Sequence, residues 1–139
     1  MDRRGGTELG LSRDNPLDGD NGKGYDRLAG GVEFLGLDGL IVAGGGGTMQ
    51  LLNELSKRGL KVIGVPRGVD KDNYGTDTTL GFNSAVEGAS KFIDLARTDA
   101  GSQRNAVYVL EVMGREAGHL ALHSGMAAGA VVILIPEVR

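Results

Sequence analysis

The stretch VAGGGGTMQLLNEL, residues Val42–Leu55, places four consecutive glycines between an apolar run typical of a strand and a run typical of a helix. Glycine loses more backbone entropy on ordering than any other residue. Four in a row therefore weaken a fold unless the backbone needs a positive φ or a ligand must approach it closely. Gly44–Gly47 thus predict one of two structures, a tight turn or a cradle for phosphate groups.

Four short apolar runs, rich in β-branched residues, predict strands that are buried on both faces. They are Asp38–Gly44, Lys61–Pro66, Ala106–Val112 and Val131–Pro136. Between them, apolar residues recur at helical spacing in Met49–Leu55 and Val86–Ala96, and small residues fill Arg115–Ala130. This alternation predicts an α/β fold, an open parallel (Rossmann-like) sheet with helices on both faces and right-handed crossovers.

The overall composition limits the classes of function. The chain has 139 residues, about the size of one domain, and a net charge of -3 without a cluster of Lys and Arg. We therefore expect no nucleic-acid or anionic-membrane surface. The absence of cysteine excludes a disulfide framework and a thiolate metal site, and it fits a reducing compartment. No apolar run reaches membrane-spanning length, so we expect a cytoplasmic protein.

Polar and charged residues follow the expected strands at the edge where open α/β sheets bind ligands. A glycine turn there directs backbone N–H groups and the positive end of the next helix at an anion, and Thr48 is expected to cap that helix. After the next strand, Arg67 can bind phosphate, and Asp70 can accept a proton from a substrate hydroxyl. Arg115 follows the third expected strand. Each residue taken singly also fits a solvated turn.

The same segments resemble the N-terminal domain of the phosphofructokinases. The family's patterns GGTxLGxSR, GGDGT, TIDND, GTDYTxGF, EVMGRxAG and GGAxxxxxPE have counterparts here in the same order. These are GGTELGLSR at residues 5–13, GGGGT at 44–48, PRGVDKD at 66–72, GTDTTLGF at 75–82, EVMGREAG at 111–118 and GAVVILIPE at 129–137. The resemblance covers essentially the whole chain, and it implies transfer of a phosphoryl group to the 1-hydroxyl of fructose 6-phosphate in glycolysis.

The resemblance also implies roles for particular residues. Asp70 would be the general base, Asp72 would lie beside it near the metal, and Arg13 would stabilise charge on the transferred group. The donor's phosphates would be bound by Arg13, Gly45, Gly46, Gly47, Thr48 and Arg67. The sugar phosphate would be bound by Gly68, Asp70, Arg104, Met113, Gly114 and Arg115. Arg104 resembles an arginine that the family lends across a subunit interface, so a homo-oligomer is expected for the full-length protein.

Several positions depart from the family's pattern. Gly46 stands where the family has an Asp or Glu associated with Mg²⁺, so no metal ligand is certain in this chain. Gly68 and Lys71 replace the usual Thr and Asn of TIDND. Residues 1–139 are expected to be a partial domain that lacks the family's first strand with its phosphate loop and the second domain. Low or absent activity of the isolated chain is therefore expected.

Three questions of function stay open at this stage. Gly47 favours ATP as the donor, whereas the basic residue Arg67 is also consistent with pyrophosphate as the donor. The lipid and NAD kinases share a GGDGT-like turn, but they lack the PRGVDKD and EVMGREAG segments. The third reading is a non-catalytic remnant that binds phosphate without transferring it, and Gly46 supports that reading.

Overall fold

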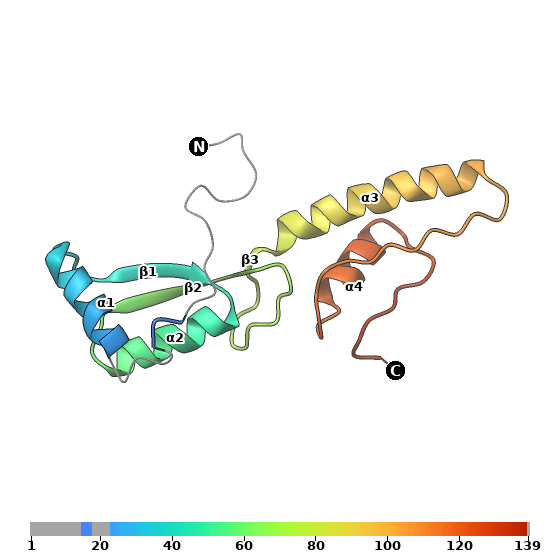
Figure 1. Cartoon of the computed structure of the whole chain (residues 1–139). Helices are drawn as coiled ribbons and strands as arrows, with labels where there is room; N and C mark the ends of the chain where they lie inside the picture. Colours follow the sequence, from blue (N-terminus) through green and yellow to red (C-terminus); the bar gives the residue numbers. More distant parts are fainter. Residues whose placement is uncertain (1–14, 18–22, 139) are drawn as a thin grey trace.

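The computed structural model describes residues 15–17 and 23–138 (Figure 1). The helices are α1 (Lys23–Phe34), α2 (Gly46–Lys57), α3 (Phe82–Ser102) and α4 (His119–Ala127), and the strands are β1 (Leu40–Gly44), β2 (Val62–Gly68) and β3 (Leu80–Gly81). The strands form one sheet in the order β1-β2-β3, and both neighbouring pairs are parallel. The predicted α/β class with a parallel sheet is confirmed.

Helix α2 connects β1 to β2 and covers one face of this strand pair (Figure 1). Its buried Leu52 and Leu55 form the core here, since their helical spacing places both on the face that meets the strands. Gly64 lies under the same helix, and a Cβ atom there would stand 2.7 Å from the sulfur of Met49. The absence of a side chain on Gly64 therefore lets α2 approach β2 closely.

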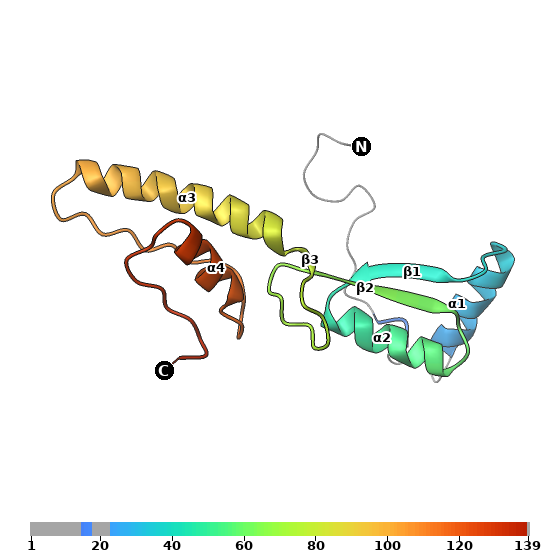
Figure 2. The same ribbon diagram turned by 180° about the vertical axis from the view of Figure 1, so that it is seen from behind.

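The opposite face of β1 and β2 is open within the described residues (Figure 2). Ile41 and Ile63 are partners in the ladder, and their side chains are 76% and 63% exposed. Helix α1 does not cover them, because it meets the end of α2: the Tyr25 hydroxyl donates to the Arg58 carbonyl at 2.6 Å. The second layer of helices expected from the sequence is thus not seen over this face in residues 23–138.

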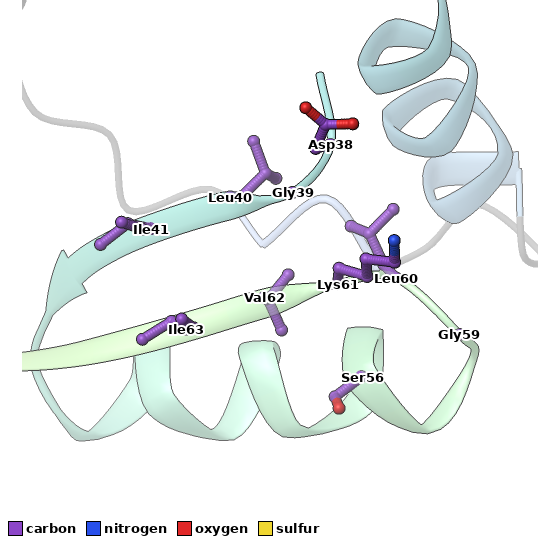
Figure 3. A pocket seen from close by; sticks show the side chains of 10 residues that line it. All are labelled: Asp38, Gly39, Leu40, Ile41, Ser56, Gly59, Leu60, Lys61, Val62 and Ile63. Carbon is purple, nitrogen blue, oxygen red and sulfur yellow. The ribbon is translucent and has the colours of Figure 1, made fainter. Parts of the chain in front are cut away.

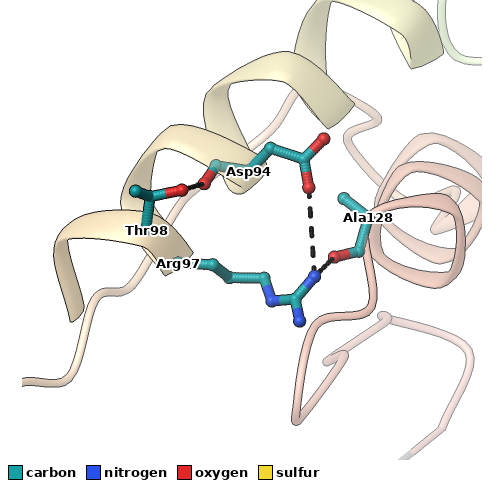
Figure 4. A network of polar contacts seen from close by, with 4 residues as sticks. All are labelled: Asp94, Arg97, Thr98 and Ala128. Atoms are coloured by element: carbon teal, nitrogen blue, oxygen red, sulfur yellow. Dashed lines mark hydrogen bonds and ion pairs between the residues drawn. The ribbon is translucent and has the colours of Figure 1, made fainter. Parts of the chain in front are cut away.

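Helices α3 and α4 pack against each other beside the sheet, and the short strand β3 leads into α3 (Figure 1). The Arg97 guanidinium donates to the Ala128 carbonyl at 2.6 Å, where α4 ends (Figure 4). The rings of Phe82 and His123 meet edge to face at 5.1 Å between centroids. No helix in the described ranges has the length and hydropathy to cross a membrane.

Two predicted strands are wrong. The backbone at Ala106–Val112 and Val131–Pro136 is outside the sheet, and Val109 and Val131 are 91% and 98% exposed. A strand needs a hydrogen-bonded neighbour, and among the described residues the sheet ends at the two-residue β3, which offers neither segment a place. The helix predicted within Arg115–Ala130 forms only as α4, because tight turns precede it.

Glu137 holds the start of α4. Its carboxylate accepts a hydrogen bond from the Gly118 N–H at 2.7 Å, and this bond is the main reason why the pKa of Glu137 lies below its ordinary value of 4.5. A carboxylate beside the first N–H groups of a helix also opposes the positive end of the helix dipole.

We expect Glu137→Gln to make the stability of the chain less dependent on pH. A carboxyl group whose pKa is lowered by folding stabilises the native state above its unfolded pKa, and that contribution is lost as the pH falls through the folded value. The parent should therefore exceed the Gln variant in free energy of unfolding by more at about pH 7 than at about pH 3. Urea unfolding at both pH values tests this, and equal stability at neutral pH would contradict it.

Candidate active site

The glycine turn forms the junction between β1 and α2. Strand β1 ends at Gly44, Gly45 is the N-cap residue, and the Met49 N–H donates to the Gly45 carbonyl at 3.0 Å. The N–H groups of Gly46, Gly47 and Thr48 precede that bond and have no carbonyl one turn earlier to bind. Together with the helix dipole, these three donors make the turn suitable for an anion.

Thr48 does not cap α2, so that expectation is wrong. The cap residue is Gly45, and no side chain hydrogen-bonds there. Thr48 lies in the first turn, and its half-buried side chain packs over Gly44, where a Cβ atom would overlap the Thr48 Cβ and hydroxyl. The sequence pattern misplaced the cap because glycine also serves as an N-cap residue.

Strand β2 extends past the glycine turn and leads into the loop of residues 69–79. Gly44 pairs with Pro66, so Arg67 and Gly68 lie beyond the end of β1. The Arg67 carbonyl is 3.8 Å from the position of a Cβ on Gly45, while the Arg67 side chain is exposed. Buried Thr79 donates its hydroxyl to the Gly68 carbonyl at 2.7 Å, which closes the loop at its base.

Asp70 begins this loop and carries an unusual carboxylate. Its Oδ1 atom is buried and has no hydrogen-bond partner. Buried polar atoms are nearly always paired, so an unpaired carboxylate oxygen in the loop whose Asn73 reaches the glycine turn is typical of a site that receives a ligand. Asp72, two residues further on, is exposed.

Asn73 belongs to the same site, and the sequence analysis missed it. Its amide oxygen stands 3.3 Å from the position of a Cβ on Gly46. This contact joins the loop to the glycine turn across 27 residues of sequence. In the sequence, Asn73 is marked only by being a polar residue directly after Asp72, and the loop contains several other polar residues.

The expected sugar-phosphate residues lie around the start of α4. Met113 is exposed, Gly114 is buried at φ 150°, and Arg115 is exposed at φ 53°. The Ala117 N–H donates to the Gly114 carbonyl at 2.8 Å, which makes this a tight turn. Within the described residues no hydrogen bond, ion pair or ring contact joins Arg115 to Asp70 or to the glycine turn.

Arg104 was expected to act across a subunit interface, and it does not lie at this edge of its own chain. Arg104 follows α3, whereas the loop with Asp70 precedes it; a helix of 21 residues spans about 30 Å. Arg13 lies outside the described residues. The convergence of arginines on Asp70 therefore stays a prediction.

The side chains at the glycine turn do not fit a directly bound divalent cation. Gly46 offers no carboxylate, the side-chain oxygens beside the turn are the neutral Thr48 hydroxyl and Asn73 amide, and the helix end presents N–H groups. Mg²⁺ prefers carboxylate and phosphate oxygens. In the ranges that the structure describes, no three His, Asp or Glu side chains cluster closely enough to hold a metal ion.

A separate hollow lies at the other end of the strands. It is lined by the start of β1, the start of β2 and the end of α2, including Asp38, Lys61 and Ser56 (Figure 3). Parallel strands place these starts opposite the glycine turn. Ligands of open α/β sheets bind at the carboxyl ends of strands, so this hollow is not the candidate site.

Replacing Thr79 by Val should cost about 1–3 kcal/mol of unfolding free energy, because it keeps the shape of the side chain but removes the donor of the part-buried Gly68 carbonyl. Exposed Thr78 offers a matched control, and Thr78→Val should change stability little. Urea unfolding measures both. Equal stabilities for the two variants would show that this bond does not hold the loop.

Known proteins share the whole of this chain. The family profile described as Phosphofructokinase matches residues 1–139. ATP-dependent 6-phosphofructokinase 3 of Streptomyces coelicolor is 47% identical over 134 residues, which are 96% of this chain and 38% of the relative. The pyrophosphate–fructose 6-phosphate 1-phosphotransferase of Amycolatopsis methanolica is 46% identical, with the same coverage of 96% and 38%. The solved phosphofructokinase of Saccharomyces cerevisiae superposes with a TM-score of 0.73 at 32% identity, over 91% of this chain and 19% of that one.

These matches agree with the fold. The chain spans 38% of the length of the two bacterial relatives named above. The likeness to a solved structure covers 91% of the chain. The chain belongs to the phosphofructokinase family.

Proposed function

We propose that this chain takes part in the transfer of a phosphoryl group from ATP to the 1-hydroxyl of fructose 6-phosphate, which gives fructose 1,6-bisphosphate. The observation that carries the proposal is the buried, unpartnered Oδ1 of Asp70, in the loop that contacts the turn of free N–H groups. A phosphoryl transfer needs a base for the attacking hydroxyl and a cradle for the donor. We assign the base to Asp70 and the cradle to the glycine turn at the start of α2.

Asp70 accepts the proton of the sugar hydroxyl while that oxygen forms its bond to the terminal phosphorus of the donor and the bond to the leaving phosphate breaks. The N–H groups of Gly46, Gly47 and Thr48 hold the donor's phosphates through the helix end. Arg67 and Arg13 add positive charge for the transferring group. Asp72, two residues after the base, is assigned a place beside it.

The acceptor side of the site is assigned to Gly68 and to the turn with Met113, Gly114 and Arg115. An exposed guanidinium is suited to a phosphate because it offers several N–H donors in a planar fork. Arg104 stands beyond the far end of α3, about 30 Å from its start. We therefore assign it to the site of a second copy, which makes a homo-oligomer the working form.

The donor is assigned as ATP, with pyrophosphate as the alternative. A relative named for ATP and one named for pyrophosphate are 47% and 46% identical to this chain, so overall similarity does not separate them. The family resemblance adds Mg²⁺ as a companion of the donor phosphates. We derive no step through it, because the glycine turn does not offer a carboxylate. The cytoplasm is the assigned compartment, in keeping with a sequence that has no cysteine.

The test is an assay of fructose 6-phosphate phosphorylation with ATP and with pyrophosphate, paired with calorimetric binding of each donor. Turnover with one donor supports the proposal and identifies that donor. Binding without turnover favours the non-catalytic remnant, for which Gly46 is the supporting observation. If the chain neither binds a donor nor turns it over, both functions are contradicted.

A further inference from the structure

The inference begins at the contact between Gly46 and Asn73. The Asn73 amide oxygen stands 3.3 Å from the point where a Cβ on Gly46 would be, which is closer than most contacts of real Cβ atoms. By comparison, nothing lies within 4 Å of the same point on Gly47. A side chain at position 46 and the amide of Asn73 therefore compete for one space.

The fold holds Asn73 in this place. The bond from Thr79 to Gly68 closes the loop, and Lys71 takes a left-handed conformation at φ 55°, which turns the chain back toward α2. Asn73 is half-buried, yet its amide makes no hydrogen bond within the described part of the chain. An amide carries two N–H donors and one acceptor oxygen, so both functions are free to meet a ligand.

We propose that Asn73 is a ligand of the donor's phosphates that replaces the side chain missing at Gly46. The amide oxygen lies nearest Gly46 in this structure, so the amide must rotate for its N–H groups to join the three backbone N–H groups at the start of α2. The turn then presents neutral donors to an anion. A carboxylate at position 46 would instead repel the phosphates unless a cation lay between them. Phosphate binding at this turn therefore depends only weakly on Mg²⁺. This inference rests on the proposed function.

Calorimetric titration of the chain with inorganic pyrophosphate, and separately with ATP, tests the role of Asn73. Each titration is done with Mg²⁺ and with EDTA. The parent should bind with similar affinity in both buffers, and Asn73→Ala should weaken binding about tenfold in both, the typical size for a lost hydrogen bond to a charged group. Asn53 supplies the control, since it is an exposed amide on α2, and Asn53→Ala should bind like the parent.

Two further variants test the charge argument and the shared space. Asn73→Asp is nearly isosteric, and it should lose more affinity than Asn73→Ala in EDTA and regain part of it with Mg²⁺. Gly46→Asp should also weaken binding in EDTA. The effects of Gly46→Asp and Asn73→Ala should not add, because the first displaces the amide that the second removes.

The outcomes separate the inference from the function. A parent chain that binds neither donor overturns both. If the parent binds and the Asn73→Ala and Asn73→Asp variants bind with the same affinity, Asn73 has no role in binding. The proposed function is then not affected. Additive effects at positions 46 and 73, or a parent that loses binding in EDTA, also overturn the inference. Circular dichroism of every variant distinguishes weak binding from loss of the fold, and Asn73→Asp serves where the Ala variant does not fold.

Discussion

Replacing Asp70 by Asn is expected to lower the rate of fructose 6-phosphate phosphorylation by about 10²–10⁴-fold, the usual contribution of a positioned general base. The amide has nearly the shape of the carboxylate, but it cannot accept the proton of the attacking hydroxyl. Because Oδ1 of Asp70 has no partner in the described structure, the substitution breaks no hydrogen bond and stability should change little. Initial rates with the preferred donor measure the first effect, and urea unfolding measures the second.

Asp77 provides the matched control for this prediction. It lies in the same loop of residues 69–79, its side chain is exposed, and no role is assigned to it. Asp77→Asn should therefore keep the parent rate, which separates the loss of one base from a general loss of charge in the loop. If Asp70→Asn retains the rate of the control, another group takes the proton and the proposed mechanism is wrong.

The sequence alone was sufficient for β1, α2 and β2, whereas helix α1 was not predicted. The runs at Asp38–Gly44 and Lys61–Pro66 are continuous and apolar, and α2 has a regular apolar spacing, so local pattern and tertiary burial agree in β1, α2 and β2. The glycine turn followed from the same reasoning, because parallel strands bring their carboxyl ends to one edge. The same reasoning predicts that Asp70 lies at this edge.

The remaining features depend on contacts that a local pattern does not encode. Ala106–Val112 has the pattern of a buried strand, but a strand exists only beside another strand, and among the described residues none adjoins it. The position of Asn73 near Gly46 depends on the conformation of a loop that the Thr79 hydrogen bond closes. The cap of α2 shifted from Thr48 to Gly45 because packing of Thr48 over Gly44 decided the position of the helix.

The structure gives the four glycines different roles, and this leads to the last prediction. Gly44 has no room for a side chain, because a Cβ atom would overlap the Cβ and hydroxyl of Thr48. Gly46 faces the amide of Asn73 at 3.3 Å, and Gly45 has only the Arg67 carbonyl nearby, at 3.8 Å. Nothing lies within 4 Å of a Cβ on Gly47. The turn is therefore not uniformly flexible, since one of its glycines is required by packing.

Gly44→Ala is accordingly expected to destabilise the chain by about 1–3 kcal/mol, the usual cost of forcing extra atoms into a packed site. The clash falls on the Cβ of Thr48, which moves only with its backbone, so the strand and the helix must separate. Gly47→Ala should change the free energy of unfolding in the opposite direction. It should stabilise α2 by up to about 1 kcal/mol, because alanine orders in a helix at lower entropic cost than glycine. Urea unfolding of both variants measures the difference. Equal effects would mean that the turn relaxes freely, and the close packing of Thr48 over Gly44 would then not be what fixes the start of α2.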